Sequence, residues 1–234
     1  MTIEPNLDAN LDLFDLGREA LAAARKAFDG QAFFVSARRL QPDGTWLGPQ
    51  GATLSLVEEG ALAGLGGLVA VQKLGANGVV CEVAGLAADE AVGLGMRCLA
   101  RVSFVAGESS DARGARLDQL RDLVQRIPGL DSVLPTPVGE AQGLDTLQFF
   151  AACRLACPSL HVVVDVESLG PKLGQLCLSF GADELLGAIM GQRALRLGAH
   201  ASSNALTRDE AALLLRASGF SPCERLPEGK VQVL

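Results

Sequence analysis

One stretch of the sequence, residues 143–189, limits most strongly what this chain can fold into. Apolar residues recur at three- and four-residue intervals in its first part, which predicts an amphipathic helix that Pro158 ends. The following run, residues 161–166 (HVVVDV), is β-branched and almost continuously apolar, as in a strand that is covered on both faces of a parallel sheet. Residues 173–180 predict a second helix, and Gly181 stands at its carboxyl end, before a short strand. This alternation predicts an α/β fold.

The remainder of the chain continues the alternation. We expect strands at residues 32–36, 78–83, 99–106 and 131–137, and helices at residues 7–28, 87–93 and 111–127. Residues 53–73 are interpreted as one helix interrupted by glycines, and the cluster at residues 64–67 is interpreted as close helix packing because it lacks the spacing of a dinucleotide loop. Thr207 and Glu210 form a capping box before a last helix, which Gly219 ends.

Four motifs stand out in the second half of the chain: residues 143–147 (GLDTL), 154–155 (RL), 169–175 (LGPKLGQ) and 181–187 (GADELLG). They resemble the radical S-adenosylmethionine enzymes that make aminofutalosine, cyclise dehypoxanthine futalosine or build the deazaflavin chromophore. Those enzymes carry a helix that begins GxDDLRT, then RL, a strand, LGPKLAQVAL and GADDLxGT. Near the amino terminus, residues 13–17, 29–30 and 35–42 occupy the places of the family's DLLxLG, HG and VNRxINPTN patterns. The resemblance implies an α/β fold, a partial (β/α) TIM-like barrel of about six mainly parallel strands with an N-terminal helix. Residues 1–234 are expected to form one degenerate domain of this type.

The resemblance breaks after Pro42. Where the family continues into the CxxxCxxC loop, residues 43–51 (DGTWLGPQG) contain neither thiol nor imidazole. A cluster that reduces S-adenosylmethionine needs three thiolates and one open iron. We therefore expect neither a 4Fe–4S cluster nor S-adenosylmethionine binding, and no metal. The chain is also shorter than the intact enzymes, which indicates that the cluster loop and one or two βα units have been lost.

Six cysteines are scattered through apolar stretches, without the dense spacing of a disulfide framework. We interpret them as reduced, buried side chains. Cys153 and Cys157 share the opening spacing of the cluster motif, but its third position is Leu160 and the pair falls within a predicted helix. The core interpretation is therefore preferred.

Charge and hydropathy exclude several classes of partner. The formal net charge is -7 and the sequence pI is about 4.9, which gives no electrostatic basis for binding nucleic acid or an anionic membrane. Because there is neither a signal-like amino terminus nor an apolar run of spanning length, we expect a cytoplasmic protein.

Candidate binding residues follow from the barrel expectation, since ligands of α/β barrels bind at the carboxyl ends of the strands. The candidates are Ser36, Arg38, Glu108, Ser109, Thr136, Asp165, Glu167 and Asp183. The acids among them suit hydroxyl or amine groups of a ligand better than a phosphate, although each candidate could instead be a loop cap or a surface charge. The two histidines match no catalytic or metal motif, and His161, at the start of a buried strand, is interpreted as structural. No catalytic residue is assigned.

Three functions follow as hypotheses. The first is a pseudoenzyme of menaquinone biosynthesis by the futalosine pathway, which binds a small pathway ligand or pairs with an intact radical enzyme. The second is a cluster-independent lyase or isomerase that uses carboxylates at the barrel mouth. The third is a structural protein that assembles as an oligomer through an open barrel edge.

Overall fold

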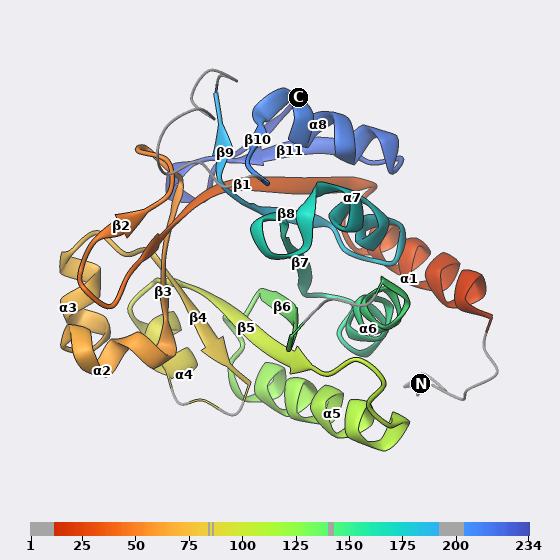
Figure 1. Ribbon diagram of the computed structural model, residues 1–234, viewed down its shortest axis with the longest axis horizontal. Helices are drawn as coiled ribbons and strands as arrows, with labels where there is room; N and C mark the ends of the chain where they lie inside the picture. The colour runs from red at the N-terminus through yellow and green to blue at the C-terminus, as the bar shows by residue number, and fades with distance from the viewer. Residues whose placement is uncertain (1–11, 84, 86, 140–142, 192–203) are drawn as a thin grey trace.

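The computed structural model describes residues 12–83, 85, 87–139, 143–191 and 204–234. It is an α/β structure in which parallel strands alternate with helices after an N-terminal helix (Figure 1). The main strands are β1 (Gln31–Leu40), β3 (Leu54–Glu58), β4 (Gly78–Glu82), β5 (Arg97–Phe104), β6 (Ser132–Pro137), β7 (His161–Asp165), β8 (Glu184–Gly187) and β11 (Ser221–Arg225). Short strands are β2 (Trp46–Leu47), β9 (Ile189–Met190), β10 (Leu206–Thr207) and β12 (Val231–Val233).

The helices are α1 (Leu13–Ala27), α2 (Leu62–Leu65), α3 (Leu68–Lys73), α4 (Ala87–Gly93), α5 (Ser110–Arg126), α6 (Gly143–Ala156), α7 (Val166–Ser179) and α8 (Arg208–Ala217), with short 3-10 turns η1 (Glu59–Ala61) and η3 (Pro227–Gly229). Asp12 caps α1, Ser109 caps α5, and the predicted capping box of Thr207 and Glu210 begins α8. Within the described residues, no helix combines the length and the apolar character that crossing a bilayer would require.

Seven parallel strands close into a barrel in the order β1-β3-β4-β5-β6-β7-β8, and β8 pairs again with β1. The TIM-like fold with its N-terminal helix is therefore confirmed, but the barrel is closed and has one more strand than expected. The open edge, on which the hypothesis of assembly through that edge depended, is absent from the barrel that these strands form, because β1 is paired with both β8 and β3.

The additional strand lies in the segment that we expected to be one helix, residues 53–73, and that prediction was wrong at its start. Leu54 and Leu56 face the barrel interior, whereas Val57 packs outward under the helices. The alternation places buried apolar side chains on both faces of β3. The segment is a strand and not a helix because both of its faces are buried in the sheet. The α-helix begins only at Leu62, after the 3-10 turn η1, and Gly66 and Gly67 separate α2 from α3 with φ angles of 86° at both residues.

The barrel interior is filled by side chains. Its middle layer consists of aliphatic residues from all seven strands: Val35, Ala37, Leu54, Leu56, Val80, Leu99, Leu134, Val163 and Leu186. A narrow barrel of this kind is a packed core and not a pore. A second core lies between the outer faces of the strands and the surrounding helices, where α1 packs on α6 and α7 (Figure 1).

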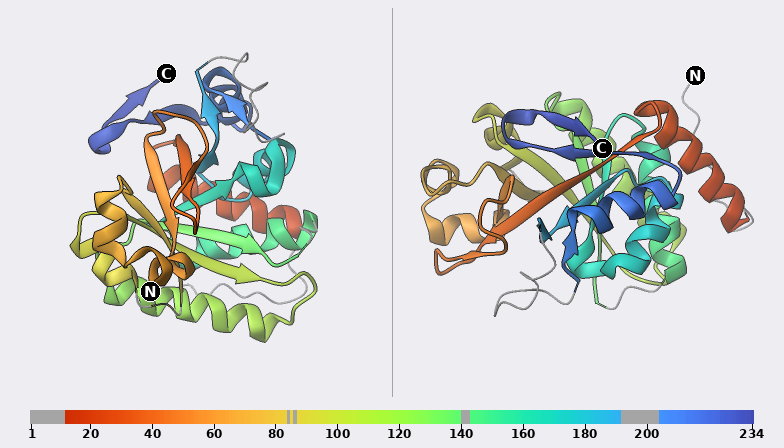
Figure 2. Two further views of the ribbon diagram at one scale, coloured as in Figure 1. Left: turned by 60° about the vertical axis from the view of Figure 1, so that its left-hand side comes forward. Right: turned by 90° about the horizontal axis from the view of Figure 1, so that it is seen from above.

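The carboxyl-terminal strands lie outside the barrel. β11 pairs in parallel with the first residues of β1, Gln31–Phe34, and β12 adds to it in antiparallel fashion (Figure 2). Since β8 occupies the other edge of Phe33 and Phe34, β11 shares with β3 one edge of β1. β1 therefore changes its partner along its length, from β11 at its start to β3 at Ala37.

Candidate functional site

The carboxyl ends of the strands form a charged mouth above the aliphatic layer. Because side chains alternate along a strand, the positions two residues beyond the inward-facing aliphatic residues also face the barrel axis. Those positions hold Arg39, Glu58, Glu82, Arg101, Thr136 and Asp165. The mouth is therefore lined by side chains of both signs.

Arg39 connects β1 to two other strands of the mouth. Its Nη1 donates to Glu58 Oε1 at 3.1 Å and its Nη2 to Asp165 Oδ2 at 2.7 Å. Glu167 Oε2 lies 3.9 Å from its Nε. One guanidinium thus neutralises part of the charge of three carboxylates.

Arg101 forms the second cationic centre of the mouth. Its Nη1 lies 2.8 Å from Glu58 Oε2 and 3.3 Å from Glu82 Oε1. The contact with Glu58 lacks the alignment of a hydrogen bond, and both Glu58 Oε2 and Arg101 Nε are buried without a hydrogen-bond partner among the described residues. Buried polar atoms of this kind ordinarily bind protein groups, water or a ligand.

The carboxyl group of Glu167 has a raised pKa. Burial raises its pKa and the neighbouring charge of Asp165 raises it further, against the opposing effect of Arg39. Asp165 itself is held in place by its role as the N-cap of α7, where its side chain accepts from the Glu167 backbone N–H. The mouth thus holds one carboxyl group that binds a proton more readily than usual.

Three of the residues predicted from the sequence belong to this mouth: Thr136, Asp165 and Glu167. The sequence interpretation missed Arg39, Glu58, Glu82 and Arg101. A period-two reading of β1, β3, β4 and β5 would have found them, because each follows an inward-facing aliphatic residue by two positions.

Ser36 and Arg38 do not face the mouth. Ser36 Oγ donates to the carbonyl of Ile189 at 2.7 Å, and Arg38 Nε donates to Ser55 Oγ at 2.8 Å. The Arg38 guanidinium also stacks on the Trp46 ring, 4.3 Å from its centroid. Both side chains fix the strands and the loop around β2.

Glu108 and Ser109 lie just after β5, at the start of α5. Glu108 Oε2 accepts from Arg116 Nε at 3.1 Å, and Ser109 Oγ accepts from the backbone N–H of Ala112 as the N-cap. In these contacts the two residues stabilise the helix end.

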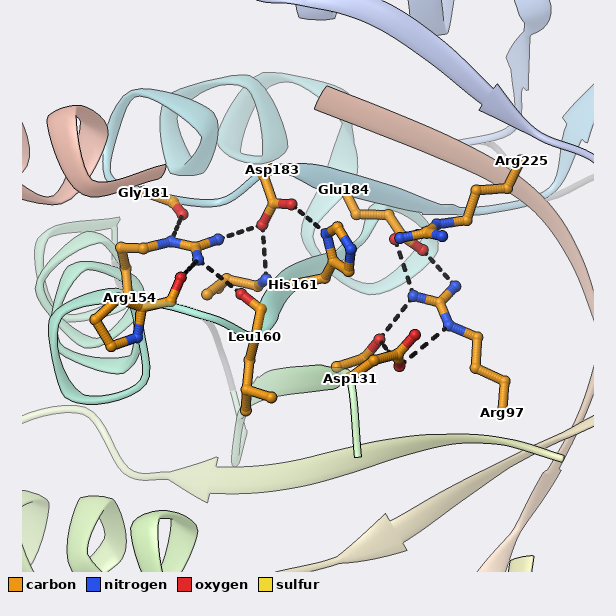
Figure 3. A network of polar contacts seen from close by, with 12 residues as sticks. Arg97, Asp131, Arg154, Leu160, His161, Gly181, Asp183, Glu184 and Arg225 are labelled. Carbon is orange, nitrogen blue, oxygen red and sulfur yellow. Dashed lines mark hydrogen bonds and ion pairs between the residues drawn. The ribbon is translucent and has the colours of Figure 1, made fainter. Parts of the chain in front are cut away.

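Asp183 lies at the opposite, amino end of the barrel, because β8 begins only after it. It is completely buried and pairs with Arg154, His161 Nδ1 and the backbone N–H of Val162 (Figure 3). Arg154 also donates to the carbonyls of Gly181, Pro158 and Leu160. The sequence motifs RL (residues 154–155) and GAD (residues 181–183) thus meet in a buried structural network, which agrees with the structural interpretation of His161.

A second charged group lies beside this network, at the amino ends of β5 and β8. Glu184 is completely buried and accepts from Arg97 at 2.6 and 2.9 Å and from Arg225 at 2.7 Å (Figure 3). Burial alone would raise the pKa of Glu184, but the two guanidiniums outweigh it and hold the pKa at about 2. Both ends of the barrel axis are therefore polar, and only its middle is aliphatic.

The segment that follows β1 does not fit the loop of a three-thiolate iron–sulfur cluster. The segment between β1 and β3 folds back on β1 through β2, and it contains no cysteine. The six cysteines lie on β4, β5, α7, β11 and at α6, and all are buried and free. Burial raises the pKa of Cys153, Cys157 and Cys177, which disfavours the thiolate form that binds iron. Among the described side chains, no group of three or more acidic, histidine or cysteine residues is placed to hold a metal ion.

Comparison with known proteins shows the fold of this chain. No protein-family model matches the sequence. No curated protein matches it either. The structure is similar to that of methylornithine synthase (PylB), with a TM-score of 0.61 and 12% identity over 90% of this chain and 89% of that chain.

Two structures of HydG, a maturase of the FeFe-hydrogenase, are also similar. One gives a TM-score of 0.60 and 11% identity over 90% of this chain and 68% of that chain. The other, from Carboxydothermus hydrogenoformans, gives a TM-score of 0.61 and 11% identity over 90% of this chain and 72% of that chain. These neighbours are radical S-adenosylmethionine enzymes. At this identity the likeness shows a shared barrel fold and no more.

Proposed function

We propose that this protein is a non-catalytic relative of the radical S-adenosylmethionine barrels that works without an iron–sulfur cluster. One observation carries the proposal: the segment after β1 has no thiolate and returns onto β1 as a short antiparallel strand. The barrel mouth above it is held together by ion pairs of Arg39 and Arg101 with carboxylates. Together these features support the proposal, because a cluster that reduces S-adenosylmethionine needs three thiolates and the segment after β1 offers none.

The charges and hydrogen-bond acceptors of the mouth indicate which class of ligand it would bind. Glu58, Glu82, Asp165 and Glu167 outnumber the two guanidiniums, so the mouth carries an excess of negative charge when all are ionised. The buried Glu58 Oε2 can accept a hydrogen bond. These features suit a ligand with amine or hydroxyl donors, such as a nucleoside of the futalosine pathway to menaquinone.

Chemical analysis tests the absence of the cluster. We expect protein that is purified without oxygen and treated with iron and sulfide to retain well under one cluster per chain after desalting. Neither an absorption band near 400 nm nor cleavage of S-adenosylmethionine should appear with a chemical reductant. One stoichiometric cluster, with three cysteines that become resistant to alkylation, would overturn the proposal.

Calorimetric titration with aminofutalosine tests the ligand. We expect saturable binding that the Glu58→Gln variant weakens by roughly tenfold, because a hydrogen bond to a charged group contributes about 1.5–3 kcal/mol. Glu90→Gln on the exposed face of α4 is the matched control and should bind as the parent does. Equal binding by all three proteins would place the ligand elsewhere.

A cluster-independent lyase or isomerase is the second candidate, and the raised pKa of Glu167 favours it. A carboxyl group of this kind keeps its proton to a higher pH than an ordinary glutamate does, which suits a role in general acid–base catalysis. This function predicts turnover of a pathway nucleoside that is lost in Glu167→Gln but kept in Glu90→Gln. Complete recovery of unchanged nucleoside after long incubation with the parent protein would rule it out.

A role as a partner subunit is compatible with the non-catalytic proposal. Val105 and Val138 follow the paired ends of β5 and β6, and Leu144 lies in the first turn of α6; these three residues are 45%, 56% and 65% exposed. Apolar side chains that gather at one end of a protein often mark a contact with another chain. Sedimentation of the protein, alone and mixed with an intact radical enzyme of the futalosine pathway, distinguishes a homo-oligomer from a mixed complex. Leu144→Glu should weaken either one.

A further inference from the structure

A cavity of about 530 Å³ lies at the amino end of the barrel, opposite the mouth. Its walls come from the starts of β3, β4, β5 and β6 and from the segment that joins β11 to β12. A cavity of this volume lies within the range of sites for small organic ligands. It is independent of the function proposed above, which concerns the other end of the strands.

The cavity exists because β1 changes partner. From Ala37 onward β1 pairs with β3, whereas Gln31–Phe34 pair with β11 along the same edge. β3 begins only at Leu54, opposite Ala37, so neither β3 nor β11 pairs with Val35 and Ser36 along this edge, and a slot opens there. Residues 225–230 cover this slot from outside, and Val35, Leu54 and Leu226 line it. The site thus results from the sheet topology and not from loose packing.

Two guanidiniums at this end of the barrel share one buried carboxylate. Arg97 forms a bidentate ion pair with Glu184, and Arg225 Nε donates a hydrogen bond to the same carboxylate. Figure 3 shows both guanidiniums turned toward Glu184 from different sides. Glu184 neutralises one of the two guanidiniums, and Asp131, 3.7 Å from Arg97 Nε, offsets part of the charge of the other.

Some N–H groups of Arg97 and Arg225 have no hydrogen-bond acceptor among the described residues. Arg225 Nη2 and Arg97 Nε are both buried, and neither has a hydrogen-bond partner in the part of the chain that the structure describes. Asp131 lies near Arg97, with Oδ1 3.7 Å from Nε, too far for a hydrogen bond, and its side chain is half exposed. A buried guanidinium N–H without an acceptor is costly, and both residues line the cavity, so an acceptor that reaches either N–H from the cavity would be bound favourably.

We infer that the cavity binds a small organic ligand through a carboxylate, with Arg225 as the main recognition residue and Arg97 beside it. A carboxylate accepts hydrogen bonds from guanidinium donors while it carries only one negative charge, whereas Asp131 at the rim repels a doubly charged phosphate more strongly. The aliphatic side chains of Val35, Leu54 and Met96 accommodate an apolar body behind the carboxylate. The ligand class is therefore an organic monocarboxylate with an apolar body of one or two rings.

Methionine NMR provides a test that reports on the cavity itself. The chain has three methionines, of which Met96 lines the cavity and Met190 lies in β9, outside it. The probes are 2-naphthoate, its uncharged isostere 2-naphthamide and inorganic phosphate, each titrated into full-length protein with 13C-labelled methionine methyl groups. We expect 2-naphthoate to shift the Met96 signal in a saturable way and to leave Met190 unchanged. The naphthamide should bind roughly tenfold more weakly or worse, and phosphate should shift neither signal.

Variants complete the test. Arg225→Met keeps the Arg97–Glu184 pair and should weaken 2-naphthoate by roughly tenfold, whereas Arg126→Met at the end of α5 should not. Native methionine signals in the variant show that it is folded. The inference fails if acid and amide shift Met96 equally, if phosphate does so, if no probe shifts it up to millimolar concentration, or if folded Arg225→Met binds 2-naphthoate as the parent does. The comparison of acid with amide on the parent protein decides the matter even if Arg225→Met does not fold.

Discussion

Arg97 and Glu184 are joined by two hydrogen bonds, of 2.6 and 2.9 Å, across the amino end of a closed barrel, although their strands β5 and β8 are not neighbours. Glu184 is completely buried, and Arg225 from β11 binds the same carboxylate. One carboxylate therefore links two barrel strands and the outer β11 strand. Its ionisation should be coupled to the stability of the whole fold.

Acid should destabilise the protein through Glu184. The pKa of this group is about 2 in the folded protein against an ordinary value of 4.5, so its contribution is complete above pH 4.5 and is lost as the pH falls toward 2. The size of the contribution is on the order of 3 kcal/mol. Urea unfolding at several pH values between 7 and 2.5 measures it, with the steepest loss expected below pH 4.5.

The substitution Glu184→Gln should lower the free energy of unfolding at pH 7 by about 3–5 kcal/mol, because two buried guanidiniums lose their shared counter-charge. The variant should also lose less stability than the parent between pH 4.5 and 2.5. Glu90→Gln on the exposed face of α4 is the control and should behave as the parent does. A variant with the parent's acid dependence would show that the proton binds elsewhere.

Arg154 and Asp183 should show strong energetic coupling. Arg154 is completely buried, and its guanidinium satisfies three backbone carbonyls as well as the carboxylate. Either Arg154→Met or Asp183→Asn alone should cost about 3–5 kcal/mol, since each leaves a buried charge without its partner. The double variant should cost less than the sum of the two. Additive losses in urea unfolding would contradict the coupling.

The sequence was sufficient for the fold class, because the regular exchange of apolar strands and amphipathic helices is a local signal. The strand expected at residues 161–166 is β7 and the helix expected before it is α6, whereas α7 begins at Val166, ahead of the helix expected at residues 173–180. The prediction of a partial barrel with about six strands was wrong because residues 53–73 were expected to form one helix, whereas their first part forms β3. β3 is a short strand with apolar residues on both faces, and such a run differs from helix only through the neighbours that it meets in space.

The sequence was less informative about the site. Asp183 stands in a motif that the family also has, yet the structure places it in a buried network at the amino end, with Arg154 and His161. Whether a polar residue near a strand faces the axis, the helices or solvent depends on strand register, which composition does not encode. Arg39 and Arg101 were missed for the same reason.

Glu167→Gln should stabilise the protein slightly at pH 7. The pKa of Glu167 is raised by burial and by Asp165, so its charged form is disfavoured in the folded state, and stability falls as the pH rises above 4.5. Removing the charge should add about 0.5 kcal/mol, the scale of a partly exposed ion pair, and the gain should vanish near pH 4. Urea unfolding at pH 7 and pH 4 measures both values. A loss of stability at pH 7 would instead mean that the ion pair with Arg39 is the dominant effect.

Gly181→Ala should separate backbone strain from close packing at the junction of α1, α6 and α7. Gly181 has a φ of +92°, and an added Cβ would lie 2.8 Å from the Arg154 Cβ and 2.9 Å from the Ala20 Cβ. Gly30→Ala is the matched control, because Gly30 has a φ of +71° and no atom within 4 Å of an added Cβ. The control should lose about 1–2 kcal/mol from the left-handed backbone alone, and Gly181→Ala about 3 kcal/mol or more, because overpacking adds to the strain. Equal losses in urea unfolding would mean that α1 can move away from Gly181 without cost, and that the packing of the N-terminal helix on α6 and α7 is looser than the contacts of Gly181 indicate.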